Sequence, residues 1–208
     1  MDCRGQGGLS QNVGIPCGST FKGHILRGIR CEDPSYLLYR DIYLDAAQMV
    51  RIVMSMPEVD EKRVGAFGGS EGGGLTLACA ALTPGLNRAA AQFPFLCDFK
   101  RSWEHGCASC TTSELREYFR RFDPRHQYEN DLFTRLGNID NQHLAHRIRA
   151  EVLMLTGLLD QEGLPEMQFA AYNQIASSKQ VLIYPDHGHE ELPEGDNEII
   201  QFFLKMEG

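Results

Sequence analysis

Short apolar runs alternate along this chain with longer segments in which apolar residues recur every three or four positions. Such runs predict buried strands, at residues 63–67, 89–93, 151–156 and 180–184. The periodic segments predict helices, at residues 36–56, 71–82, 165–175 and 198–205. In the first helix, Ile42, Ala46, Met49 and Val53 recur on one face. Strands that alternate with helices form a parallel sheet with covered faces, so the pattern predicts an α/β fold.

Two segments depart from this alternation. Residues 9–37 contain glycines, prolines and few periodic apolar positions, so we expect an irregular loop there. Residues 97–147 are predicted to be mainly helical and to form a polar excursion from the sheet. No internal repeat divides the chain, and we expect residues 1–208 to form a single domain.

Composition narrows the class of protein. The chain has 208 residues, of which 42% are hydrophobic and 23% charged, as in ordinary globular proteins. Its net charge of -8 argues against nucleic acids and anionic membrane surfaces as partners. No apolar run approaches the ~20 residues that a membrane-spanning helix needs. The seven cysteines are scattered and odd in number, which favours reduced thiols and a cytoplasmic location.

Residues 64–78, VGAFGGSEGGGLTLA, combine an apolar strand, a glycine-rich turn with one serine, and a small-residue helix. A G-x-S-x-G nucleophile elbow requires this context, because the strained turn exposes the hydroxyl of Ser70. The backbone N–H of Glu71 then lies at a helix N-terminus, where it can stabilise an oxyanion. We expect Arg4 and Gln6 to brace this elbow through hydrogen bonds. The alternative is an ordinary strand-to-helix turn with a solvent-facing serine.

An acid and a histidine follow two later strands. Asp160 comes shortly after the strand at 151–156, and His189 follows the strand at 180–184. Ligands bind at the carboxyl ends of parallel strands, and Ser70, Asp160 and His189 stand in the order used by α/β-hydrolases. A histidine that takes the serine proton and a carboxylate that orients the imidazole complete a catalytic triad.

Each proposed partner of Ser70 has a competing residue of the same type nearby in the sequence. His187 lies two positions before His189, and Asp186 could replace Asp160 as the acid. We prefer His189 because Gly188 lets the loop turn its side chain toward the serine. We prefer Asp160 because Asp186 adjoins the histidine loop itself.

Other constellations give weaker signals. His105, Cys107 and Cys110 resemble half of a zinc site, but no second cysteine pair follows at a suitable spacing. We therefore expect free thiols there, and neither a metal nor an organic cofactor. Trp103 is expected to pack between helices, with stacking on a sugar as the weaker alternative.

Several motifs together resemble carbohydrate esterase family seven, the acetyl xylan esterases and cephalosporin-C deacetylases. The resemblance runs in order along nearly the whole chain and covers the C-terminal two-thirds of the family's domain. The matching pieces are RGQG at 4–7, ILRGI at 25–29, VGAFGGSEGGG at 64–74, PFLCDF at 94–99, RFDP at 121–124, FAAYN at 169–173 and GHE at 188–190.

The resemblance implies a function. It makes Ser70 the nucleophile, Asp160 the triad acid, His189 the base and the backbone N–H of Glu71 an oxyanion donor. It implies removal of acetyl groups from acetylated xylo-oligosaccharides or cephalosporin C. It also implies a cytoplasmic enzyme without a cofactor that forms a homo-oligomer, a hexamer in this family.

The chain departs from the family pattern in three places. Glu71 stands where the family has glutamine, and a carboxylate near an oxyanion is repulsive unless it points away or is protonated. Residues 163–165 read GLP where the family continues with Cys-Pro-Pro. The family's domain begins before the motif at 4–7, with the first strands and a tyrosine that supplies the second oxyanion donor. We expect a chain without that part to lose activity and to expose an apolar sheet edge.

The sequence thus predicts a serine carboxylesterase of an α/β-hydrolase type that lacks the first strands. One alternative is an inactive remnant of such an esterase, which keeps the triad residues without a complete site. Another is a different α/β-hydrolase, such as a peptidase or a dienelactone hydrolase. The latter would be expected to carry cysteine at position 70, so Ser70 favours the esterase.

Overall fold

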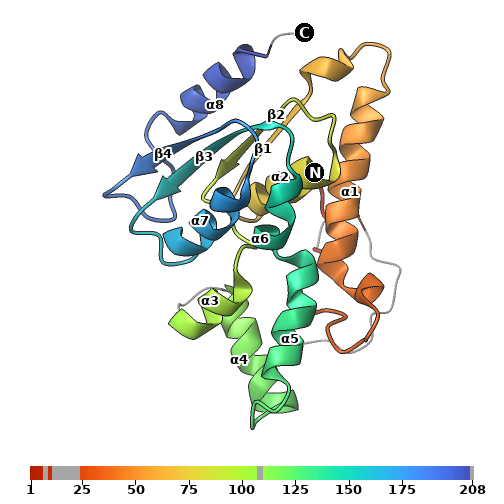
Figure 1. Cartoon of the computed structure of the whole chain (residues 1–208), viewed down its shortest axis with the longest axis vertical. Helices are drawn as coiled ribbons and strands as arrows, with labels where there is room; N and C mark the ends of the chain where they lie inside the picture. The colour runs from red at the N-terminus through yellow and green to blue at the C-terminus, as the bar shows by residue number, and fades with distance from the viewer. Residues whose placement is uncertain (7–8, 11–23, 107–109, 207–208) are drawn as a thin grey trace.

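The computed structural model describes residues 1–6, 9–10, 24–106 and 110–206, with residues 110 and 111 described by their backbone alone. At its centre lies a four-stranded parallel sheet in the order β1-β2-β3-β4 (Figure 1). The strands are β1 (Gly65–Gly69), β2 (Arg88–Gln92), β3 (Glu151–Gly157) and β4 (Lys179–Tyr184). The α/β fold expected from the sequence is confirmed, and each expected strand overlaps one of these.

The helices also follow the expected order along the chain. The α-helices are α1 (Leu38–Met54), α2 (Glu71–Leu82), α3 (Phe99–His105), α4 (Cys110–Phe122), α5 (Glu129–Leu136), α6 (Asn141–Leu144), α7 (Pro165–Gln174) and α8 (Gly195–Leu204). The 3-10 turns are η1 (Pro34–Tyr36), η2 (Glu61–Arg63), η3 (Gly137–Ile139) and η4 (Ala145–Arg147). The segment at 97–147 is mainly helical, as expected.

The central strands of the sheet are covered on both faces because their side chains alternate between two cores. Ala89 and Ala91 of β2 pack in one cluster with Leu77 of α2, on the face that α7 also covers. Ala90, between them, packs in a second cluster with Ile199 of α8. Apolar residues at successive strand positions are therefore all buried, which is typical of a parallel sheet. The carboxyl ends of the strands remain free to carry a site.

A third core joins α1 to the helical excursion. Ile42 of α1, Phe99 of α3, Phe119 of α4 and Leu132 of α5 are all buried in it. In Figure 1, α3, α4 and α5 lie together beyond the end of the sheet, and α1 approaches them with its N-terminal end. The excursion therefore shares a core with the first turns of α1 and leaves its polar faces to solvent.

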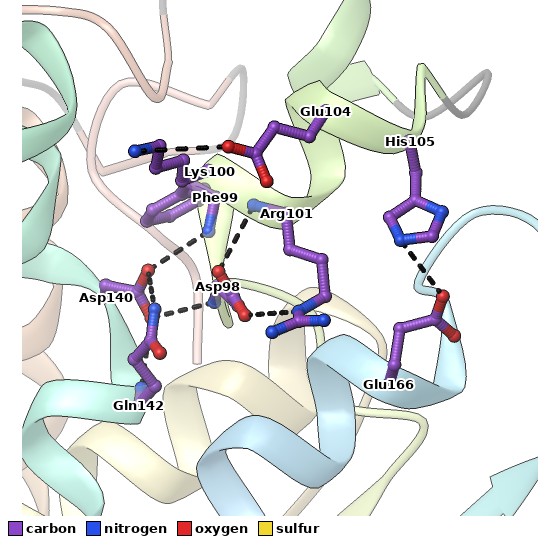
Figure 2. Close-up of polar contacts among 9 residues, drawn as sticks. All are labelled: Asp98, Phe99, Lys100, Arg101, Glu104, His105, Asp140, Gln142 and Glu166. Atoms are coloured by element: carbon purple, nitrogen blue, oxygen red, sulfur yellow. Dashed lines mark hydrogen bonds and ion pairs between the residues drawn. The ribbon is translucent and has the colours of Figure 1, made fainter. Parts of the chain in front are cut away.

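Asp140 fastens the start of the excursion to its end (Figure 2). Its carboxylate is 3% exposed and accepts hydrogen bonds from the backbone N–H groups of Asp98 at 2.8 Å and Phe99 at 3.0 Å. It also accepts two from Gln142, one from the backbone and one from the side chain. Burial raises the pKa of Asp140, and these four donors oppose that rise. Asp98 in turn caps α3 and pairs with Arg101 at 2.8 Å.

The apolar face of α1 is only partly buried. Ile42 and Ala46 lie in the core, but Met49 is 43% exposed and Val53 is half-buried. Both line a hollow of about 310 Å³ together with Phe67 of β1. Within the described parts of the chain, no strand pairs with the outer edge of β1. Met49 thus faces the uncovered outer edge of β1 rather than a packed layer of the fold.

Candidate active site

Ser70 forms a strained turn between β1 and α2. Its backbone has φ 55° and ψ -118°, a conformation that residues with a side chain rarely adopt. The turn is tight, because a Cβ atom on Gly68 would lie 2.5 Å from the backbone of Gly72. The N–H of Ser70 donates to the carbonyl of Gln92 at 3.0 Å, and the N–H of Phe95 donates to that of Ser70 at 2.9 Å. The chain after β2 therefore holds the strained residue.

The structure brings Ser70, His189 and Asp160 into one hydrogen-bonded chain. The Oγ atom of Ser70 lies 2.8 Å from Nε2 of His189, and Nδ1 of His189 lies 2.8 Å from Oδ2 of Asp160. These residues follow β1, β4 and β3, so the shared carboxyl edge of the sheet gathers them. With Nδ1–H donating to the carboxylate, Nε2 is left to accept the serine proton.

Asp160 is held as a buried carboxylate. It is fully buried, and Oδ1 accepts from the backbone N–H groups of Glu162 and Gly163, both at 2.9 Å. Oδ2 accepts from His189 and also from the side-chain amide of Gln168 on α7, at 3.2 Å. These donors fix which oxygen faces the histidine. Sequence reasoning missed Gln168, since nothing marks a helical glutamine as a partner of a distant loop.

The surroundings of His189 favour its charged form. The hydrogen bond to Asp160, with the charges of Asp160 and Glu162, raises the pKa of His189, while partial burial works against the rise. The carboxylate of Glu162 lies 3.9 Å from Nε2 of His189. The ring of Phe93 packs against the imidazole, with centroids 4.5 Å apart. The imidazole is thus oriented by a carboxylate on one side and a ring on the other.

The competing residues lie elsewhere. The ring of His187 packs against Tyr184, with centroids 5.8 Å apart, and it makes no hydrogen bond to Ser70 among those that the structure describes. Asp186 is exposed on the loop after β4. Gly188 donates its N–H to the side chain of Glu190 at 2.9 Å, which shapes the loop that carries His189.

The side chain of Glu71 is bound by two neutral donors. Its Oε1 atom accepts from the amide of Gln6 at 2.6 Å and from the hydroxyl of Tyr39 at 3.0 Å. The carboxylate is therefore held toward α1 and the loop at residues 4–6. The backbone N–H of Glu71 belongs to the first residue of α2, where N–H groups have no partner inside the helix. Sequence reasoning missed Tyr39, which lies on a helix with no motif around it.

Arg4 does not reach the elbow itself. Its guanidinium makes two hydrogen bonds to Asp45, at 2.5 and 2.6 Å, and one to Asp41 at 3.3 Å, both on α1. Arg4 therefore fixes the loop at residues 4–6 to α1. Gln6, in the same loop, makes the hydrogen bond to Glu71 at the elbow.

A pocket of about 460 Å³ opens at Ser70 and His189. Its walls come from the loop at 4–6, the segment at 24–25, α1, α2, α4 and the loop after β3. Glu114 of α4 holds one wall, since its carboxylate accepts from the N–H of Leu26 at 2.8 Å and that of Ile25 at 3.4 Å. The lining residues are Gln6, His24, Ile25, Tyr39, Ser70, Glu71, Phe95, Ser113, Glu114, Glu162 and His189.

The remaining candidates do not meet at this pocket. Figure 2 shows His105 paired with Glu166, and the atoms Nε2 and Oε1 of this pair are 3.5 Å apart. Cys107 and the side chain of Cys110 lie outside the described residues. Among the described residues, no three ligand-type side chains gather as a metal site would require. Trp103 packs on Phe119, with centroids 4.9 Å apart, as expected for a helix contact. No helix in the described part of the chain has the length and apolarity to cross a bilayer.

A parallel sheet that carries a linked serine, histidine and aspartate at its carboxyl edge defines a protein of the α/β-hydrolase type. The chain belongs to the acetyl xylan esterase (AXE1) family, whose model matches residues 1–206. It is 50% identical to acetyl xylan esterase 1 from Thermoanaerobacterium sp. JW/SL YS485, with a TM-score of 0.96, over 100% of this chain and 65% of that one.

Two further relatives agree with this membership. The acetyl xylan esterase from Paenibacillus sp. R4 is 37% identical, with a TM-score of 0.94, over 99% of this chain and 64% of that one. The acetyl esterase Axe7A of Xylanibacter ruminicola is 25% identical over 167 residues, which are 80% of this chain and 36% of that protein. The chain therefore spans less than two thirds of the length of these relatives.

Proposed function

We propose that this chain carries the catalytic residues of a serine esterase that removes acetyl groups from small acetylated carbohydrates of the xylan type. The observation that carries the proposal is the hydrogen-bonded chain from Ser70 through His189 to Asp160, whose first two members line a pocket. Membership of the acetyl xylan esterase family supports an acetylated sugar as the substrate. The resemblance also implies cephalosporin C, which carries an acetyl ester of the same kind, as a second candidate substrate.

The reaction follows from the geometry. His189 accepts the proton of Ser70 at Nε2, while Oγ attacks the carbonyl carbon of the acetyl ester. The tetrahedral oxyanion that results is stabilised by the backbone N–H of Glu71 at the start of α2. The sugar hydroxyl leaves with the proton from His189, and the acetyl group stays on Ser70. Water, deprotonated by His189, then releases acetate and restores the serine.

The binding of the Glu71 side chain bears on the oxyanion. Gln6 and Tyr39 hold its carboxylate, so they keep that negative charge from turning toward the tetrahedral oxygen. The backbone N–H can then act as a donor although the family's glutamine is replaced.

The first test is hydrolysis of p-nitrophenyl acetate by the purified chain beside its Ser70→Ala variant. We expect the parent to exceed the variant by ~10³-fold or more, since the serine supplies the nucleophile. The release of acetate from acetylated xylo-oligosaccharides, measured with the same two proteins, then tests whether the substrate is an acetylated sugar. Equal rates for parent and variant would contradict the proposal and favour the inactive remnant.

A further inference from the structure

The side-chain amide of Gln168 joins Asp160 to the loop that follows it. Gln168 lies near the start of α7, whose first residue is Pro165. Side chains of a helix lean toward its N-terminus, so Gln168 reaches back over the loop at 161–163. Its Nε2 atom donates to the carbonyl of Gly163 at 2.5 Å and to Oδ2 of Asp160 at 3.2 Å. One amide group therefore holds both the acid and its loop.

These contacts form a closed ring around the carboxylate of Asp160. The N–H groups of Glu162 and Gly163 donate to Oδ1, while Gln168 and His189 donate to Oδ2. A Cβ atom on Gly163 would lie 3.7 Å from Oδ2 and 3.8 Å from Nε2 of Gln168, so the loop backbone lies close over this contact. Rotation of the carboxylate would break several of these hydrogen bonds at once.

The oxygen of the same amide is not satisfied. Gln168 is fully buried, and its Oε1 atom has no hydrogen-bond partner among the described residues. A buried oxygen without a donor lowers stability, and an apolar side chain of similar size would avoid that penalty. Because half of this amide is unpaired, a gain in stability alone does not account for a glutamine here. The contact of the other half with Asp160 indicates a role in function.

We propose that Gln168 is a positioning residue of the esterase, which holds Oδ2 of Asp160 in line with Nδ1 of His189. This inference rests on the proposed function and adds a residue to its machinery. Gln168 does not line the pocket, so it acts through Asp160 rather than on the substrate. Without the amide, the carboxylate can turn, and the imidazole loses the orientation that proton transfer from Ser70 needs.

The test replaces Gln168 by methionine, which has a similar length and no donor. Gln168→Met should lower kcat for p-nitrophenyl acetate by roughly 10- to 100-fold and leave KM nearly unchanged, because the defect lies in proton transfer. The acid limb of the pH–rate profile should also move to lower pH. Asp160 and Glu162 are the charged groups that raise the pKa of His189, and a loosened Asp160 raises it less.

Gln142→Met is the matched control. The amide of Gln142 donates to the buried carboxylate of Asp140 at 3.1 Å, beside backbone N–H donors, as Figure 2 shows. No hydrogen bond described by the structure links this pair to the triad, so kcat and the pH midpoint should stay as in the parent.

A second variant keeps the test independent of how methionine packs. Gln168→Asn retains a buried amide but shortens its reach, so we expect the same fall in kcat and the same shift of the midpoint. A midpoint that stays or rises in both Gln168 variants would overturn the inference, since a merely structural residue leaves the pKa of His189 unchanged.

A spectroscopic measurement separates this inference from the proposed esterase activity. In the Ser70→Ala background, proton NMR detects the Nδ1–H of His189, whose resonance lies far downfield when a carboxylate accepts the hydrogen bond. We expect Gln168→Met to shift this resonance upfield or remove it, and Gln142→Met to leave it in place. That result supports positioning even where the parent shows no turnover. The same resonance in both variants contradicts positioning even where the parent hydrolyses p-nitrophenyl acetate.

Discussion

At the scale of single residues, the orientation of His189 depends on groups that are distant in the chain. Asp160 fixes its Nδ1 side, and Gln168 with two backbone N–H groups fixes Asp160. Removal of the Gln168 amide leaves Oδ2 of Asp160 with one fewer donor in a buried position, at a cost of about 1–3 kcal/mol. The positions of the nucleophile and base are therefore set by α7 and two loops as well as by the elbow.

The pH dependence of catalysis follows from the same contacts. Only neutral His189 can take the serine proton, so kcat/KM should rise with pH through the pKa of His189. Because Asp160 raises that pKa above the ordinary 6.5, the midpoint of the acid limb should lie above 6.5.

Asp160→Asn should move that midpoint down and lower kcat by ~10⁴, because the amide no longer holds the required tautomer. A pH–rate profile of both proteins with p-nitrophenyl acetate measures the two effects. An acid limb at the same pH in parent and variant would contradict the assignment of Asp160. Asp186→Asn, at the exposed competitor, is the control that should leave the profile unchanged.

At the scale of helices and strands, the features that could be predicted are those marked by residues close together in the sequence. The helix expected at 71–82 is α2 with the same bounds, because a glycine-rich turn and a proline-containing stop signal mark its ends in sequence. Ser70, Asp160 and His189 could be placed because parallel strands bring their carboxyl ends to one edge. Tyr39 and Gln168 were missed because their partners lie on remote segments. The periodicity of the sequence places Met49 on the apolar face of α1, but it does not predict which residues pack against that face.

The junction between the sheet and the helical excursion depends on Asp140. Asp140→Ala removes the acceptor of two backbone N–H groups, those of Asp98 and Phe99, in a buried region. We expect the free energy of unfolding to fall by about 2–4 kcal/mol, measured by urea denaturation. Glu166→Ala, which removes only an exposed ion pair with His105, should cost less than about 1 kcal/mol. Equal losses in the two variants would show that Asp140 does not fasten the junction.

At the scale of the whole molecule, the faces of the central strands are covered, while β1 and β4 are the edge strands among the described residues. The helix α8 packs on one face, and the outer edge of β1 borders the hollow that contains Met49, Val53 and Phe67. An edge strand with unpaired backbone groups and apolar side chains is a template for pairing with another chain. The relatives are longer, and this chain spans 65% of the Thermoanaerobacterium enzyme.

We therefore expect the purified 208-residue chain to self-associate through this hollow as its concentration rises. Phe67 is 67% exposed on β1, and Phe67→Glu places a charge where two such edges would meet. Light scattering coupled to gel filtration should then show a lower average mass at the same concentration. Tyr128→Glu is the matched control, because Tyr128 is an aromatic residue with 64% exposure that does not line the hollow. If both variants change the mass equally, association runs through general surface apolarity, and the edge of β1 has no special part in it.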